Sequence, residues 1–304
     1  MLYPNFNELA KFKNRKLALA HFSNRKSTLT AAGGHDSTFK GRGLEFDSVR
    51  EYAFGDDIRT IDWRVTARSG KPHVKLFKQE HERQVIIVLD MNAPMRFGTK
   101  NTFKSVIAAK IASYLGWQAL GAHDRTSACL FGDVEGGLQF FNTAKNKKSF
   151  SMMLKTLTMP PIEHHKVSFK QVIGHIDKIA HPGSLLYLIS DFLEINHQES
   201  VEPELNRLHR KCDIVFLSVN DRSDKEIPPL GILGFHASDK EKMVVNTSSA
   251  SGRELYRQQW NVNRKFLHAM ASKYKVPLME LSTESNVELD LPKALKRIGR
   301  RRGK

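Results

Sequence analysis

The sequence predicts an α/β protein, built on a mostly parallel β-sheet with helices on both faces. Continuous runs of apolar and β-branched residues alternate with segments whose apolar residues recur at helical spacing, over residues 83–219. Such runs are typical of strands that are buried on both faces. Because neighbouring parallel strands need a crossover connection, usually a helix, this alternation favours a parallel sheet.

The predicted strands and helices follow from these two patterns. The strands are Arg83–Asp90, Arg125–Phe131, Gly137–Phe141 (as a hairpin partner of the strand before it), Ser184–Asp191, Cys212–Val219 and Val276–Thr283. The helices run from Phe103 to Gln118 and over 146–158, 168–180, 200–210, 251–274 and 291–298, and a hairpin lies within 221–249. Asn101 or Thr102 is the expected cap of the first of these helices.

Composition and length indicate an ordinary globular protein. The chain has 304 residues, of which 40% are hydrophobic and 26% charged, and it is long enough for one large domain or two smaller ones. Its two cysteines, Cys129 and Cys212, lie in apolar runs, as buried thiols do. No apolar stretch reaches the roughly 18 residues of a membrane-spanning helix, and the N-terminus lacks the features of a secretory signal. We therefore expect a cytoplasmic protein.

The net charge of +16 is concentrated at the two ends of the chain. Residues 1–42 carry a net charge of +6 and residues 293–304 a net charge of +7, which leaves +3 for the middle. Basic ends attract nucleic acid, anionic lipid or an acidic protein face, and solvated tails are an equally good interpretation. The candidate anion-binding residues of the C-terminal end are Lys296, Arg297, Arg300, Arg301 and Arg302.

These observations predict three parts along the chain. Residues 1–82 form an N-terminal basic and irregular segment with a small subdomain that contains strands. Residues 83–290 form the α/β domain. Residues 291–304 form a basic C-terminal tail.

The densest motif extends from Gly41 to Asp90. It contains a Glu-Phe pair, a run of the form RxYxxGDDxRxIDWxxxAR and a charged step into the first strand, and it strongly resembles the DUF58 family, whose activity is largely uncharacterised. The segment Ser190–Glu194 is a second match. The matching residues of the motif are Glu45, Phe46, Arg50, Tyr52, Gly55, Asp56, Asp57, Arg59, Ile61, Asp62, Trp63, Ala67 and Arg68.

The resemblance covers roughly residues 40–220 and implies a von Willebrand factor A-like, Rossmann-like sheet. It also implies, at the level of the family, a partnership with an AAA+ ATPase of the MoxR class, in which the von Willebrand protein acts as an adaptor that binds a client. A fold alone does not establish such a function.

The resemblance further implies a place for a divalent cation. Von Willebrand A domains often hold Mg²⁺ through a DxSxS loop after the first strand, a threonine from a later loop and an aspartate after a middle strand. Here the DxSxS positions are Asp90, Asn92 and Pro94, and the later aspartate is Asp191, with Ser190 beside it. Mg²⁺ prefers carboxylate, hydroxyl and amide oxygens, and Pro94 offers none from its side chain.

The threonine position is also doubtful, because the segment around it reads PPIEHHKVS. The remaining candidates for it are Ser168, Glu163, His164 and His165. The sequence therefore predicts a degenerate metal site. An alternative interpretation, which we favour, is that Asp90 and Asp191 cap helices or accept hydrogen bonds from loop backbone.

The segment GDDIRTIDW allows two interpretations. Its carboxylates could be paired with the arginines around them, so that the segment is a structural turn in which Trp63 and Tyr52 pack on the domain. Alternatively it could be a docking surface centred on Trp63 and Arg59, since tryptophan and arginine often anchor interfaces.

Three functions remain open on these observations. The first is a non-catalytic, protein-binding adaptor. The second is a nucleic-acid or anionic-membrane binder that uses the basic ends. The third is a metal-dependent enzyme, which we regard as the weakest because no nucleophile with its base, P-loop or HExxH motif occurs in the sequence.

Overall fold

The computed structural model describes residues 3–14, 44–79, 83–144, 146–160, 165, 167–193, 195, 201–236 and 242–302. The chain divides into two compact units: a main unit of Met1–Lys26 with Arg83–Lys304, and a small unit of Ser27–Glu82. Each unit is described by itself below.

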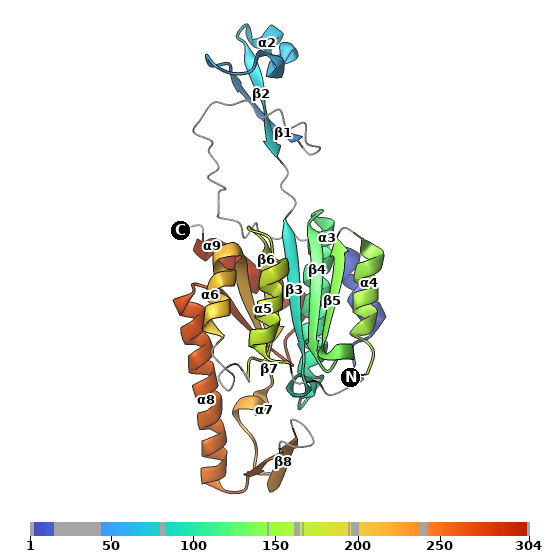
Figure 1. Ribbon diagram of the computed structural model, residues 1–304, viewed down its shortest axis with the longest axis vertical. Coiled ribbons are helices and arrows are strands. Elements are labelled where there is room, and N and C mark those ends of the chain that lie inside the picture. The colour runs from blue at the N-terminus through green and yellow to red at the C-terminus, as the bar shows by residue number, and fades with distance from the viewer. Residues whose placement is uncertain are drawn as a thin grey trace. The chain divides into compact units, whose positions relative to one another are not determined.

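The main unit contains a six-stranded sheet in the order β10-β7-β6-β3-β4-β5 (Figure 1). All neighbouring pairs are parallel except β4 and the edge strand β5, which are antiparallel. This confirms the predicted mostly parallel sheet and its hairpin. The strands are β3 Gln84–Met91, β4 Arg125–Gly132, β5 Leu138–Ala144, β6 Leu185–Ser190, β7 Asp213–Asn220 and β10 Leu278–Ser282.

Helices cover both faces of this sheet (Figure 1). Alternate residues of β3 enter two hydrophobic cores: Val85, Ile87 and Leu89 pack on the face that α3 covers, and Ile86 and Val88 pack on the opposite face with residues of α5 and α6. The central strands β3, β6 and β7 are mostly apolar because both of their faces are buried. The helices of the main unit are α1 Phe6–Lys11, α3 Lys104–Gly121, α4 Lys147–Thr156, α5 Phe169–Ile179, α6 Glu202–Lys211, α7 Arg222–Lys225, α8 Ala250–Lys273 and α9 Val287–Arg302.

A hairpin and short 3-10 turns complete the described part of the main unit. The predicted hairpin is β8 Ile232–His236 paired with β9 Lys242–Asn246. Short 3-10 turns lie at Phe12–Asn14 (η1), Ala93–Arg96 (η3) and Glu135–Gly137 (η4). Among the described residues, no helix has both the length and the apolar character that crossing a bilayer requires.

The predicted boundaries of the domains differ from those of the structure at both ends. Near the N-terminus, Leu9 and Phe12 are buried in the core beside α3, and the hydroxyl of Ser113 donates to the Leu9 carbonyl at 2.6 Å. This segment therefore belongs to the main unit. At the other end, α9 begins before the predicted tail and buries Leu291 and Leu295 in the same core.

The start of α3 also differs from the prediction. Its N-cap is Phe103, which has no side chain able to cap, instead of Asn101 or Thr102. The helix begins one residue later than expected, at Lys104, whose backbone N–H donates to the Phe97 carbonyl at 2.9 Å. The preceding loop supplies this acceptor in place of a side-chain cap.

The small unit is a two-stranded antiparallel sheet with a short helix. Strand β1 (Leu44–Glu51) pairs with β2 (His73–Gln79), and between them lie the 3-10 turn η2 (Ile58–Thr60) and the helix α2 (Trp63–Ser69). Helix α2 ends at Gly70, which takes the left-handed conformation at φ 72°. The side chains of residues 44–47 and 76–79, which include the motif residues Glu45 and Phe46, lie outside the described part.

Candidate functional site

A buried aspartate stands at the carboxyl end of each of four parallel strands. Asp90 is the second-last residue of β3, and the other three directly follow their strands: Asp133 follows β4, Asp191 follows β6 and Asp221 follows β7. None of the four is more than 6% exposed. The carboxyl ends of parallel strands lie at one edge of a sheet (Figure 1). Strands β3 and β6 are neighbours where the strand order reverses, which is the point at which such sheets bind ligands.

Asp90 is held by its own loop and by the neighbouring strand. Its Oδ1 accepts from the backbone N–H of Asn92 at 2.9 Å and from the Asn92 side-chain amide at 2.8 Å. Its Oδ2 accepts from the Ser190 hydroxyl at 2.5 Å. That hydroxyl oxygen also accepts from the Phe192 N–H at 2.9 Å, so the ends of β3 and β6 are joined.

Asp191 is paired with a buried lysine. Lys104, the first residue of α3, is 1% exposed, and its Nζ donates to Asp191 Oδ2 at 2.7 Å and to the two carboxylate oxygens of Asp224 at 3.1 and 3.2 Å. The other oxygen of Asp191 accepts from the Leu193 N–H at 3.0 Å. One ammonium therefore connects the segments that follow β3, β6 and β7.

The protonation of this group follows from its burial and its charges. Burial disfavours the ammonium, but the nearby carboxylates Asp191 and Asp224 outweigh it and raise the pKa of Lys104. Burial, together with the charge of Asp191, raises the pKa of Asp224 in spite of the ion pair with Lys104. The lysine therefore stays charged.

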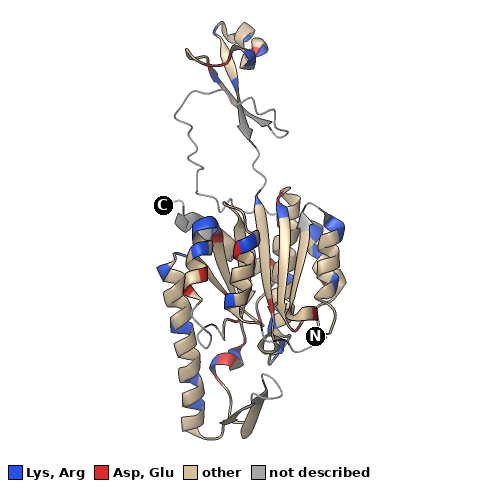
Figure 2. Ribbon diagram, in the orientation of Figure 1, with Lys and Arg blue, Asp and Glu red and all other residues tan. Residues whose placement is uncertain are grey.

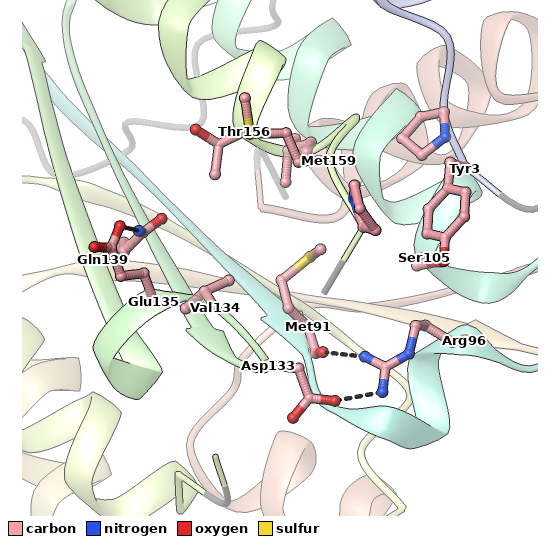
Figure 3. Close-up of a pocket in the computed structure, with 13 residues that line it drawn as sticks. Tyr3, Met91, Arg96, Ser105, Asp133, Val134, Glu135, Gln139, Thr156 and Met159 are labelled. Carbon is pink, nitrogen blue, oxygen red and sulfur yellow. Dashed lines mark hydrogen bonds and ion pairs between the residues drawn. The ribbon is translucent and has the colours of Figure 1, made fainter. Parts of the chain in front are cut away.

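Asp133 and Asp221 have partners from the same connection. Asp133 forms an ion pair with Arg96, whose other guanidinium nitrogen donates to the Met91 carbonyl at 3.1 Å (Figure 3). Asp221 accepts from the Thr99 hydroxyl at 2.7 Å, the Thr99 N–H at 3.1 Å and the Thr283 hydroxyl at 2.6 Å. Burial alone would raise the pKa of Asp221, but these hydrogen bonds lower it.

The connection between β3 and α3 thus supplies a donor to all four aspartates. We name residues 92–104 the closing segment; its donors are Asn92, Arg96, Thr99 and Lys104. Most buried polar groups in proteins are hydrogen-bonded. Here one short segment supplies a hydrogen bond or an ion pair to the buried aspartate at each of the four strand ends. We name the carboxyl ends of β3, β4, β6 and β7 the switch-point edge. Its four aspartates are satisfied by the chain's own donors.

A small, mostly apolar pocket lies beside the closing segment. Arg96, Met91 and Val134 contribute to its wall, and Tyr3 and Met159 stand at its side (Figure 3). The guanidinium of Arg96 already binds Asp133 and the Met91 carbonyl there. The guanidinium of Arg96 thus already has its partners within the protein itself.

The donor set of the edge does not fit a divalent cation. Both oxygens of Asp90 accept hydrogen bonds, Asp191 faces an ammonium, and Pro94 lies inside the η3 turn. The side-chain amide of Asn92 is turned so that its N–H group donates to Asp90. The described residues contain no group of three or more His, Cys, Asp or Glu side chains that could hold a metal ion.

The candidates for the missing threonine ligand do not complete such a site. The Ser168 hydroxyl accepts from the Gln171 N–H at 3.2 Å and caps α5. The backbone N–H of His165 donates to Asp133 at 3.2 Å. Glu163 and His164 lie outside the described residues, as does Glu194 of the second matching segment.

The aspartates of the GDDIRTIDW segment have structural partners within the small unit. Asp56 forms a bidentate ion pair with Arg50, at 2.6 and 2.7 Å. Asp57 caps η2 through the Arg59 N–H at 2.9 Å. Asp62 caps α2 by accepting from the backbone N–H groups of its second and third residues at 3.0 and 3.2 Å.

The apolar residues of the same segment are exposed in the small unit. Trp63 is 69% exposed, Ile58 is 64% exposed and Phe54 is fully exposed. Tyr52 is half-buried. Within this unit the side chains of Phe54, Ile58 and Trp63 are therefore largely uncovered.

Three arginines surround these apolar side chains in the sequence. Arg59, Arg64 and Arg68 are exposed and form no ion pair among the described residues. The basic residues of α2 are blue in Figure 2. Of the side chains described between residues 48 and 75, Val74 alone is buried.

The candidate anion-binding residues of the C-terminal end lie on α9. Lys296 and Arg297 are exposed, on the side of the helix away from the buried Leu291 and Leu295. Arg300, Arg301 and Arg302 continue the helix, and their side chains lie outside the described part. The basic end is therefore the outer face of a packed helix, at least as far as Arg297.

Sequence reasoning identified Asp90, Asn92, Ser190 and Asp191 at this edge but missed Lys104 and Asp224. The signal for Lys104 was available in the sequence. Helix α3 is apolar on almost all sides, so a lysine at its first residue has little chance of reaching solvent and needs a buried counter-ion. Asp224 gave no such signal, because it lies in a short charged stretch that resembles surface loop.

Comparisons with known proteins place these observations in a family context. The profile of the family described as "Protein of unknown function DUF58" matches residues 48–266. An uncharacterized protein of Mycobacterium bovis and one of Mycobacterium tuberculosis are each 28% identical to this chain over 204 residues, 66% of this chain and 62% of theirs. The chain thus spans about three-fifths of the length of the curated relatives it matches.

Solved structures that are similar to this chain have lower sequence identities. The conserved hypothetical protein BatB from Bacteroides thetaiotaomicron is 15% identical, with a TM-score of 0.45, over 72% of this chain and 99% of its own. The VWA domain of SpRpn10 is 10% identical, with a TM-score of 0.38, over 71% of this chain and 95% of its own.

Proposed function

Because the chain belongs to the DUF58 family, as its sequence motif predicted, and that family is described as of unknown function, we propose a function from the structure. The proposed function is that of a non-catalytic, protein-binding adaptor. It docks an AAA+ ATPase of the MoxR class through its small unit. The observation that carries the proposal is the exposure of Phe54, Ile58 and Trp63 on a unit with almost no buried side chain among those described.

The small unit has the composition of an interface. Large exposed apolar side chains are unfavourable in water, and an exposed tryptophan beside arginines is the typical centre of a binding hot spot. Meanwhile the carboxylates of the segment, Asp56, Asp57 and Asp62, already have partners. The unit therefore presents positive charge and apolar surface together.

The charge of this surface indicates the kind of partner it fits. Arg59, Arg64 and Arg68 need carboxylates opposite them, and Trp63 needs an apolar pocket. A protein surface with acidic residues around such a pocket meets both needs. The MoxR class enters as the partner that the family resemblance implies.

The adaptor role also agrees with the state of the switch-point edge. There the aspartates that could act as acids, bases or metal ligands are hydrogen-bonded to the closing segment. We propose on this ground that the main unit is a scaffold and that the chemistry of the complex belongs to the ATPase.

Tryptophan fluorescence tests the proposal. Trp63 is exposed whereas Trp117 is buried and Trp260 is half-buried, so acrylamide should quench mainly Trp63 in the free protein. Addition of a purified MoxR-class AAA+ ATPase from the same organism should protect this emission in a saturable way, and Trp63→Phe should remove the effect. Unchanged quenching at saturating ATPase would refute docking through this surface. Protection by duplex DNA instead, weakened steeply by salt, would favour a nucleic-acid binder.

A further inference from the structure

We propose that Lys104 is the resident cation of the switch-point edge: its ammonium, instead of a bound metal ion, holds together the segments that follow β3, β6 and β7. The cation role of Lys104 does not depend on what the small unit binds.

The burial of the group supports this assignment. The side chains of Lys104, Asp191 and Asp224 are 1%, 4% and 4% exposed. A buried charge is costly unless it is paired and hydrogen-bonded, and a lysine is almost never fully buried without a partner. Here both carboxylates lie within 3.2 Å of the Nζ atom. The ring of Phe97, centred 5.8 Å away, adds a cation–π contact.

The three segments joined by Lys104 are distant in sequence. Lys104 and Asp191 are 87 residues apart, and Lys104 and Asp224 are 120 residues apart. Each of the three follows a different parallel strand. Connecting carboxylates from separate strand ends is what a divalent ion does at such an edge, and here an ammonium does it.

Lys104 already places one positive charge between Asp191 and Asp224, fixed by contacts to both carboxylates. A divalent ion between Asp191 and Asp224 would lie beside this fixed ammonium, and the repulsion between the two cations is unfavourable in a buried site.

The first test is the melting temperature of the wild-type protein during titration with divalent cations. We expect the melting temperature to be the same in MgCl₂, MnCl₂ or CaCl₂ as in NaCl of equal ionic strength. A saturable rise with any of these ions that is lost in Asp191→Asn would overturn the proposal, because it would show a metal bound at this edge.

A double-mutant cycle tests the role of Lys104 itself. Lys104→Met keeps most of the side-chain volume but leaves two buried carboxylates without a cation, so the melting temperature should fall. Asp191→Asn in that background should restore part of the loss, since it removes one of the uncompensated charges while its amide oxygen can still accept from the Leu193 N–H. Additive losses would contradict the proposal.

One control variant, and a rule for variants that do not fold, complete the test. Lys110→Met changes a lysine on the same helix that is 29% exposed and paired with Glu8, and it should have little effect. A single variant that fails to fold while Lys104→Met/Asp191→Asn folds supports the proposal. If neither folds, the wild-type titration decides between ammonium and metal.

Discussion

The ammonium of Lys104 lies 2.7 Å from the Asp191 carboxylate, although the two residues stand 87 positions apart and both are buried. This contact joins the start of α3 to the end of β6 at the point where the strand order of the sheet reverses. Together with the contact to Asp224, it supplies a cation to two of the buried carboxylates at this edge from within the protein. This buried contact belongs to the main unit, whereas the exposed surface on which we place partner binding belongs to the small unit.

Removal of the Lys104 charge should make stability depend on pH. In Lys104→Met, burial and mutual repulsion raise the folded-state pKa values of Asp191 and Asp224 above their unfolded values. Groups with raised pKa values favour folding at low pH and lose that contribution as pH rises through the folded pKa. The loss relative to wild type should therefore be about 3–5 kcal/mol at pH 7.5 and clearly smaller at pH 5, by chemical denaturation. An equal loss at both pH values would contradict the assignment of buried, uncompensated carboxylates.

Asp221 should show the opposite pH dependence. Its pKa is lowered, since the hydrogen bonds from Thr283, Thr99 and the Ser223 N–H outweigh its burial. A lowered pKa gives stability that is present above the unfolded value of about 3.9 and is lost as pH falls through the folded value. The difference in unfolding free energy between wild type and Asp221→Asn should thus be constant from pH 7 to 5 and shrink below about pH 4. An equal change in Asp57→Asn, at an exposed carboxylate, would contradict the assignment to Asp221.

Gly132 should be required for the Asp90 loop. It has φ +105°, and a Cβ atom there would lie 2.6 Å from the Asn92 backbone nitrogen and 2.7 Å from the Asn92 Oδ1 atom. Gly132→Ala should therefore cost more than the roughly 1 kcal/mol expected for positive φ alone. Gly136→Ala is the matched control, because Gly136 also has positive φ but open space around it. Equal losses in the two variants would show that the close approach to Asn92 is unimportant.

The two thiols should be inert in the native state. Cys129 and Cys212 are buried and free, as the sequence predicted, and burial raises the pKa of Cys129 to about 12 and that of Cys212 to about 11. Because the thiolate is the reactive form, Ellman's reagent at pH 8 should label neither cysteine in native protein and both in denaturant. Fast labelling of either thiol without denaturant would mean that this part of the sheet opens readily.

The sheet could be predicted from sequence because its signals are local. Val85–Leu89, for example, is apolar at every position, as expected of a strand that is covered on both faces. The carboxylates Asp90 and Asp191 could be placed at one edge for the same reason, since parallel strands end together. The helix cap at Phe103 could not be predicted, because a backbone carbonyl of the preceding loop, and no cap side chain, accepts the hydrogen bond.

The partners of those carboxylates depend on long-range contacts that the sequence does not display. Lys104 meets Asp224 only because α7 follows β7 at the same edge. Likewise, the sequence left open whether Trp63 packs on the domain or belongs to a docking surface, and only the structure shows that it is exposed in the small unit. Both findings come from how the elements are arranged, not from residue type.

The most direct test of docking through the small unit is the affinity of variants for a purified MoxR-class AAA+ ATPase. Trp63→Ala should weaken equilibrium binding by a factor of about 10 or more, as loss of a hot-spot tryptophan does. Leu255→Ala is the matched control, since Leu255 is 67% exposed on α8 of the main unit and should bind as the wild type does. Wild-type affinity in Trp63→Ala, or an equal loss in both variants, would contradict the account.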